Sequence, residues 1–295
     1  MMVRIGINPL TWTNDDLPEL GESNSLETCL SEAKLAGYEG VELGRKFPRD
    51  AAVLGPILER FELSLISGWY SARLLERSAQ EEIKAAGAHL VLLKTLGAKV
   101  MVFAEVSRCV HGDRSIPLSK RPQLAPNEWK PFCERLDAMA DHLEKNGLKM
   151  AYHHHMGTLI QAEHEVDRMM GSTKSVGLLL DTGHLTFAGG DPQRALKRHA
   201  KRIVHVHCKD IRQDKLAQAL KSDWSFLDAV LGNVFAVPGD GSIDFDPILK
   251  NLAAERYAGW LVVEADQDPA KAHPLTHARI GHDCLRPLAR RYWKA

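Results

Sequence analysis

Residues 176–210 read VGLLLDTGHLTFAGGDPQRALKRHAKRIVHVHCKD and decide the fold. Short apolar runs at 176–181 and 202–209 have the length and composition of buried strands, and the residues between them have apolar positions at helical spacing. A strand, a helix and a second strand in this order predict a βαβ unit with parallel strands and a right-handed crossover.

The same alternation extends in both directions along the 295 residues. A helix is predicted from about Leu26, with Ser25 as its N-cap and Gly37 as its stop, and another over 127–145, ended by Asn146-Gly147. Eight such units close into a (β/α)8 TIM barrel, an α/β fold, here expected as one domain over 1–295. A doubly wound open sheet is less favoured, because no G-x-G-x-x-G follows the first strand. The expected strands are Val3–Asn8, Gly40–Gly44, Leu63–Trp69, Lys99–Val106, Leu148–His155, Val176–Asp181, Arg202–Lys209 and Gly259–Ala265.

Two connections are longer than the usual few residues, 107–126 and 211–242. Each follows a predicted strand, so in a barrel both lie over the carboxyl-terminal face, where barrel enzymes hold their active sites. We expect lid-like loops there, although tolerated surface insertions would give the same pattern.

Composition and charge exclude several classes of protein. Lys and Arg number 38 and Asp and Glu number 38, so the chain lacks the positive excess of a nucleic-acid binder. No apolar run approaches the ~20 residues of a membrane span, and the start of the chain lacks the apolar core of a signal peptide. The five cysteines are scattered without C-x-x-C spacing, as in a reducing compartment. The sequence predicts a cytoplasmic protein without nucleic-acid or membrane partners.

Polar groups end four consecutive predicted strands. Strand alternation places His153 and His155 on one face and His154 on the other, while His207 and Lys209 share a face. Histidines and carboxylates from neighbouring strands suit Mn²⁺, Co²⁺, Fe²⁺ or Zn²⁺. A single residue of this kind usually has only a structural role, but four successive strands favour a metal site. Further candidates for lining a substrate pocket are Asn8, Trp12, Glu42, Trp69 and Glu105.

Several segments together resemble the myo-inosose-2 dehydratase family of the xylose-isomerase-like TIM barrel superfamily. The similarity extends from Gly6 to about Pro269. The N-terminal block and the triple histidine are more specific than the motifs shared by the whole superfamily. The segments are GINPLTWTNDDLPELG (6–21), GRKFPRD (44–50), SGWYSARLLERS (67–78), YHHHMGT (152–158), LLLDTGHLTFAGGDP (178–192), HVHCKD (205–210) and VPGDGSIDF (237–245).

The resemblance implies a metal site and a reaction. Asp181, His207 and Glu264 match three superfamily ligands, and His153 takes the position of a fourth that is usually glutamate. The expected cofactor is Mn²⁺ or Co²⁺, and the expected substrate is a cyclic keto-polyol, 2-keto-myo-inositol, from which water is eliminated. Without the first glutamate, the two-glutamate proton relay of the superfamily cannot operate unchanged.

Roles within that reaction follow as expectations. Glu264 is the candidate base, His155 or His184 the candidate acid as an imidazolium, and Lys209 either stabilises an enolate or pairs with Asp181. The alternative is a metal-dependent isomerase or epimerase on the same barrel; a repair endonuclease and a non-catalytic sugar-binding barrel are less favoured. A homo-oligomer is compatible with the sequence.

Overall fold

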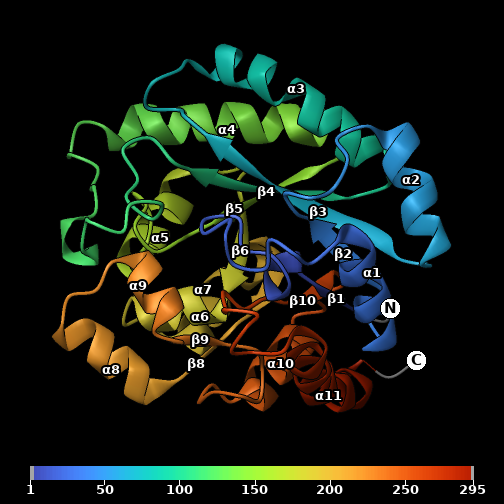
Figure 1. Cartoon of the computed structure of the whole chain (residues 1–295). Coiled ribbons are helices and arrows are strands. Elements are labelled where there is room, and N and C mark those ends of the chain that lie inside the picture. Colours follow the sequence, from blue (N-terminus) through green and yellow to red (C-terminus); the bar gives the residue numbers. More distant parts are fainter. Residues whose placement is uncertain (1–2, 294–295) are drawn as a thin grey trace.

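The computed structural model describes residues 3–293 and contains a closed barrel of parallel strands surrounded by helices (Figure 1). Around the barrel the strand order is β1-β10-β7-β6-β5-β4-β3-β2, so each strand lies beside the one before it in the βα series. This is the predicted (β/α)8 architecture. The barrel strands are β1 Arg4–Ile7, β2 Gly40–Leu43, β3 Ser64–Ala72, β4 Val100–Glu105, β5 Lys149–His153, β6 Gly177–Asp181, β7 Ile203–Cys208 and β10 Trp260–Val263.

The helices begin and end at the signals in the sequence. The hydroxyl of Ser25 accepts a hydrogen bond from the Thr28 amide at the start of α1, as predicted, and α4 is followed by Asn146-Gly147. The helices are α1 Leu26–Leu35, α2 Ala51–Arg60, α3 Ala79–Thr95, α4 Trp129–Lys145, α5 Glu163–Ser172, α6 Thr182–Phe187, α7 Pro192–His199, α8 Gln213–Lys221, α9 Phe226–Leu231, α10 Phe245–Ala254 and α11 Pro274–Tyr292, with short 3-10 turns at Pro9–Thr11, Leu118–Lys120 and Ala200–Arg202.

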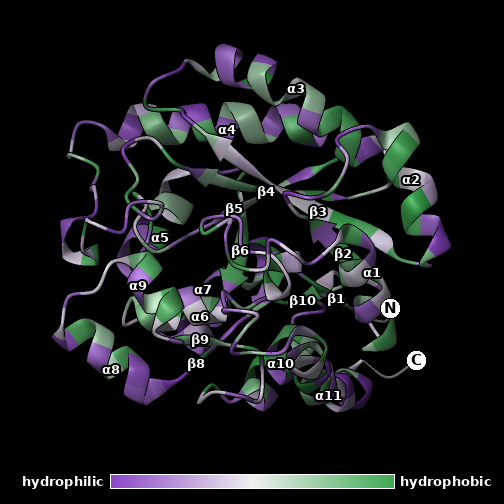
Figure 2. Cartoon of the chain, in the orientation of Figure 1, coloured by the Kyte–Doolittle hydropathy of each residue, from purple (hydrophilic) through white to green (hydrophobic). Residues whose placement is uncertain are grey.

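Alternation along the strands separates two apolar regions. Val100, Val102, Ala151 and Leu179 fill the inside of the barrel, whereas their neighbours pack outward against the helices in the main core. The helices carry hydrophobic and hydrophilic bands (Figure 2), as expected for elements that cover a barrel on one side and meet solvent on the other. The same alternation decides which residues at the strand ends face the barrel mouth.

The long connections pack against one another beyond the carboxyl ends of the strands. The Leu118 amide donates to the Trp224 carbonyl at 3.1 Å, and Arg114 pairs with Asp228 at 2.6 Å. A separate apolar cluster, which we call the cap cluster, joins them; it includes Leu17, Leu118, Met156, Phe187, Ile211, Leu216, Phe226, Leu227, Val230 and Phe235. The connections 107–126 and 211–242 therefore share one small apolar core, to which Leu17, Met156 and Phe187 also contribute.

A short antiparallel pair within the second connection was not predicted. β8 (Asp210–Ile211) pairs with β9 (Phe235–Ala236), and α8 and α9 lie between them. Two-residue strands are too short for a periodic signal in the sequence. Among residues 3–293, no helix is both long and apolar enough to cross a bilayer.

Candidate active site

Six polar side chains point into the barrel mouth from the ends of six strands. Their sequence neighbours pack in the outer core, so strand alternation directs these six side chains inward. All except the part-buried Asn8 are buried. The six are Asn8, Glu42, His153, Asp181, His207 and Glu264.

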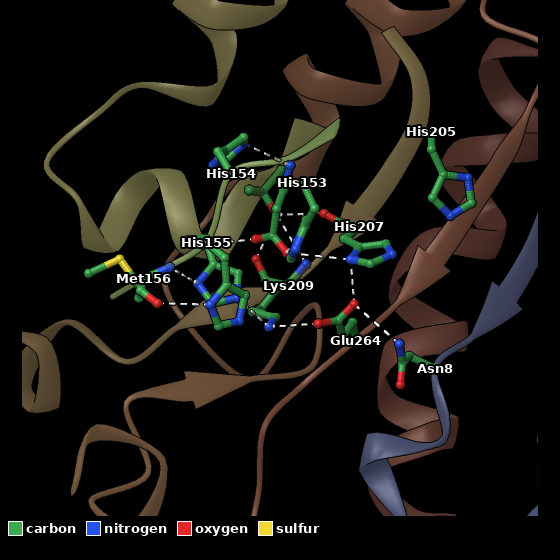
Figure 3. Close-up of polar contacts among 12 residues, drawn as sticks. Asn8, His153, His154, His155, Met156, His205, His207, Lys209 and Glu264 are labelled. Atoms are coloured by element: carbon green, nitrogen blue, oxygen red, sulfur yellow. Dashed lines mark hydrogen bonds and ion pairs between the residues drawn. The ribbon is translucent and has the colours of Figure 1, made fainter. Parts of the chain in front are cut away.

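The four predicted metal ligands are brought together. Asp181 Oδ2 lies 3.2 Å from His153 Nε2 and 3.6 Å from His207 Nδ1, and His207 Nδ1 also contacts Glu264 Oε2 (Figure 3). One atom each from Asp181, His207 and Glu264 lies within 4.8 Å of the others. Ligand atoms that share one ion at about 2.1 Å are about 3.0–3.5 Å apart, so this spacing suits a single divalent ion.

The surroundings of His207 test whether the residues fit such an ion. Nε2 lies 3.2 Å from Glu42 Oε1 and can donate its proton there, which leaves a lone pair on Nδ1. Nδ1 is buried and has no hydrogen-bond partner among the described residues, although it faces the carboxylates of Asp181 and Glu264. Burial opposes protonation of His207, but Glu264 and Glu42 outweigh it and raise its pKa well above the ordinary value. The space between Asp181, His207 and Glu264 therefore favours a positive charge. Their imidazole and carboxylate donors fit a divalent metal ion.

Asp181 serves the site and the helix that follows it. Its Oδ1 accepts a hydrogen bond from the His184 amide at 2.7 Å as the N-cap of α6, so Oδ2 faces His153 and His207. Burial raises the pKa of Asp181, but His184 and Lys209 outweigh it and hold that carboxyl well below its usual range. The helix start thereby fixes the orientation of this carboxylate.

Lys209 is fully buried in a cluster of opposite charges. Its Nζ lies 2.8 Å from Glu264 Oε1, 2.5 Å from Asp266 Oδ2 and 3.0 Å from His184 Nε2. Burial lowers its pKa, but Asp266 and Glu264 outweigh that effect and raise it above the ordinary value. A Cβ at Gly183 would lie 2.5 Å from Lys209 Cγ, so glycine makes room for this side chain. Of the two roles expected for Lys209, enolate stabilisation or pairing with Asp181, the second is not seen: the ammonium pairs with Glu264 and Asp266 instead.

The environments of His155 and His184 do not suit an imidazolium acid. His155 Nδ1 lies 2.8 Å from the Met156 carbonyl and donates to it, and His184 Nε2 accepts from the Lys209 ammonium. Burial lowers the pKa of both rings well below the ordinary value. These contacts and the burial of both rings therefore disfavour the imidazolium form that the sequence-based expectation requires.

His154 faces away from the cluster formed by its two neighbours (Figure 3). It is buried, and its Nε2 lies 3.4 Å from the Asp181 amide. Burial and the adjacent His153 lower its pKa to about 3. The alternation predicted for the triple histidine thus matches the observed orientations.

A cavity of about 620 Å³, including its open mouth, lies over the cluster. Of the predicted residues, it is lined by Asn8, Glu42, Trp69, His155, His207 and Glu264. The indole of Trp69 meets the rings of His153 and His155 edge-on, with centroid separations of 5.4 and 5.6 Å. This cavity, with polar groups converging on one end, suits a small polyol.

Two predicted substrate residues lie elsewhere. Trp12 is fully buried in the outer core, and its Nε1 donates to Glu32 Oε2 on α1 at 2.7 Å. Glu105 accepts hydrogen bonds from the amides of Leu74 at 2.6 Å and Ser107 at 2.8 Å. It shares the outward face of β4 with Phe103, because Val102 on that strand points inward. Neither Trp12 nor Glu105 lines the cavity.

The cavity also contains acidic and imidazole groups that are not among the predicted site residues. Asp15 and Asp16 come from the connection between β1 and α1, His111 from the loop after β4, and Asp266 from just beyond β10. One signal was available, since the connection from residue 8 to 25 is also longer than usual and carries the Asp-Asp pair.

Comparison with known proteins agrees with this fold. A family described as xylose isomerase-like TIM barrel matches residues 30–288. The chain belongs to the xylose isomerase-like TIM barrel family. Within it, the chain is similar to inosose dehydratases, for example those of Geobacillus thermodenitrificans (45% identity, covering 96% of each chain) and Clostridium perfringens (43% identity, covering 94% of each chain).

A further relative is not named as an inosose dehydratase. The rhizopine catabolism protein MocC of Rhizobium meliloti is 52% identical over 98% of this chain and 89% of its own length. Among solved structures, the IolI protein with a bound zinc atom superposes with a TM-score of 0.69 at 17% identity, covering 99% of this chain and all of that chain. At that identity the likeness supports the fold and nothing beyond it.

Proposed function

We propose that this family member is a metal-dependent hydro-lyase that removes water from a cyclic keto-polyol of the inosose type, with 2-keto-myo-inositol as the substrate. The observation that carries the proposal is the convergence of His153, Asp181, His207 and Glu264 beneath the cavity. The similarity to inosose dehydratases over nearly the whole chain supports the reaction class.

The four converging residues would hold the ion, Mn²⁺ or Co²⁺ in our proposal. Their imidazole and carboxylate donors, without a thiolate, suit either metal. When bound, such an ion supplies Lewis-acid stabilisation of the charge that develops on a ketone when its α-proton is removed.

The protein's own residues supply orientation and proton transfer. Asn8 donates to Glu42 at 2.7 Å and lies 3.5 Å from Glu264 Oε2, so it fixes both carboxylates at the cavity wall. Glu264 remains the candidate base, because it lines the cavity. The Lys209 ammonium lies 2.8 Å from its Oε1 and fixes the orientation of the carboxylate. Trp69 presents a flat apolar surface beside the triple histidine, suited to the C–H face of a polyol ring.

The proposal is tested by supplying 2-keto-myo-inositol to the purified protein loaded with Mn²⁺ or Co²⁺. A product lighter by one water supports the hydro-lyase reaction, and a product of unchanged mass with altered stereochemistry would instead favour an epimerase. The Asp181→Asn variant is the matched control for metal dependence. Glu264→Gln keeps a neutral oxygen in place of the carboxylate and should lower turnover by about 10²–10⁴-fold if Glu264 is the base.

A further inference from the structure

Two side chains from different connections meet in the cavity. His111 Nε2, from the loop after β4, lies 3.7 Å from Asp16 Oδ1, from the loop after β1. Both line the same cavity as His207 and Glu264. A carboxyl and an imidazole thus face each other in the space where a substrate would lie.

Both residues are positioned by their own backbone surroundings. Asn14 Oδ1 accepts from the amides of Asp16 and Leu17, each at 2.8 Å, and this turn fixes the Asp16 backbone. The Val110 amide donates to the Gly157 carbonyl at 2.9 Å. Gly157 has φ +76°, and a Cβ there would lie 2.9 Å from the His111 amide nitrogen, so glycine permits this close approach.

The ring of His111 is held by aromatic neighbours. It meets His155 edge-on at 5.2 Å and Phe226 of the cap cluster at 6.4 Å between ring centroids. Its Nδ1 is buried without a hydrogen-bond partner among the described residues. The ring is therefore oriented by packing, and Nε2 is directed to the carboxylate of Asp16.

Dehydration requires a proton for the departing hydroxyl, and the other candidate donors are committed elsewhere. His155 Nδ1 donates to the Met156 carbonyl, His184 Nε2 accepts from the Lys209 ammonium, and Asp266 is paired with that same ammonium. Burial raises the pKa of Asp15 to about 6, although Arg45 and Arg49 act against it, but Asp16 is the carboxyl that faces His111. Burial raises the pKa of Asp16 to about 6, although Lys209 acts against it. Asp16 therefore holds a proton more readily than an ordinary carboxyl does.

We propose that Asp16, paired with His111, is the general acid that protonates the leaving β-hydroxyl. This inference rests on the proposed hydro-lyase function and names the residue that completes it. Substrate that lies between Glu264 and Asp16 would meet a base at one end and an acid at the other.

The reaction balances without a further reactant. The base takes the α-proton, and the electron pair of the broken C–H bond forms the carbon–carbon double bond of an enolate. That enolate then expels the β-hydroxyl. Its C–O bond breaks while the proton held by the Asp16 carboxyl, paired with His111, is transferred to the departing oxygen. Water and the enol of a dione result. The base returns its proton to solvent, from which the pair is protonated again.

The test separates proton removal from water loss. In D₂O, exchange of the substrate's α-proton, followed by NMR, reports the base, and formation of the dehydrated product reports both steps. We expect Asp16→Asn and His111→Gln to retain α-proton exchange while dehydration falls by about 10²–10⁴-fold. Asp113→Asn, an exposed change in the same loop as His111, is the control and should leave both rates unchanged. Metal content and melting temperature are measured for each variant.

Several results would overturn the inference. One is an Asp16→Asn variant that dehydrates the substrate at the wild-type rate. Another is an equal fall of α-proton exchange and dehydration in Asp16→Asn and His111→Gln, with metal content unchanged. That second result would assign Asp16 to substrate binding. If the wild-type protein neither exchanges nor dehydrates 2-keto-myo-inositol, the proposed function fails as well.

Discussion

His207 and Glu42 form a carboxylate–imidazole pair, with Nε2 of the ring 3.2 Å from Oε1 of the acid. Because this contact selects the proton-bearing nitrogen, it directs the lone pair of Nδ1 toward Asp181 and Glu264. Glu42 also accepts from His205 at 2.8 Å and from Ser67 at 2.5 Å, so the carboxylate is itself held in place.

The first prediction concerns this pair. Glu42→Gln should weaken metal affinity by about 10–100-fold without abolishing binding, because it loosens the orientation of His207 but removes no ligand. Titration calorimetry on the metal-free protein measures the change. Glu105→Gln is the matched control, since Glu105 binds backbone amides outside the cavity, and it should leave metal affinity unchanged.

The second prediction concerns the triple histidine. His153→Ala should lose the metal and the activity, because it removes a proposed ligand 3.2 Å from Asp181. His154→Ala should retain the metal and lower the free energy of unfolding by roughly 0.5–3 kcal/mol, because it removes a buried ring that faces away from the cluster. Elemental analysis and urea denaturation distinguish the two. Loss of metal in His154→Ala alone would contradict the orientation of this strand end.

The third prediction concerns pH. In the metal-free protein the carboxylates of Glu264 and Glu42, acting against burial, raise the pKa of His207, so the ring holds a proton that the metal must displace. Affinity should therefore fall about tenfold per pH unit as pH decreases below that raised pKa, and level off above it. Chelator competition between about pH 8 and pH 6 measures the slope. An affinity independent of pH over this range would count against ligation by His207.

The fourth prediction concerns the buried ammonium. Lys209→Met leaves the carboxylates of Glu264 and Asp266 without their cation and should lower the free energy of unfolding by about 3–5 kcal/mol. Adding Asp266→Asn removes one of the uncompensated charges and should restore part of the loss. The exposed Lys271→Met should change stability by less than about 0.5 kcal/mol. Equal destabilisation by the variants at 209 and 271 would contradict a structural role for the cluster.

The barrel could be predicted because each of its strands is an apolar run long enough to show periodicity. Alternation predicted the inward orientation of His153, and in the structure Asp181 follows the same rule, since the neighbours Tyr152 and Leu180 belong to the outer core. Glu105 was misplaced because a strand end was treated as pointing inward without counting its register from Val102. Trp12 was misplaced because a large aromatic residue suits a buried core as well as a pocket.

The rest of the candidate site depends on contacts between the connections that follow different strands. No local sequence pattern contains such contacts. Asp16 and His111 are 95 positions apart in the chain and come together only after the barrel closes. The pairing of Lys209 with Asp266 likewise depends on the orientation of both side chains at adjacent strand ends. Periodicity in a single sequence carries no information about either pair.

The cap cluster has a consequence for how substrate enters. Leu17, Leu118 and Phe226 come from three different connections yet share one apolar core, so moving one connection alone would expose the surface that the other two bury. These connections should therefore open together, as a cooperative unit with one rate rather than as independent loops. Amide hydrogen exchange across 107–126 and 213–231 would then show a common protection factor, and a bound polyol would slow exchange in both segments equally.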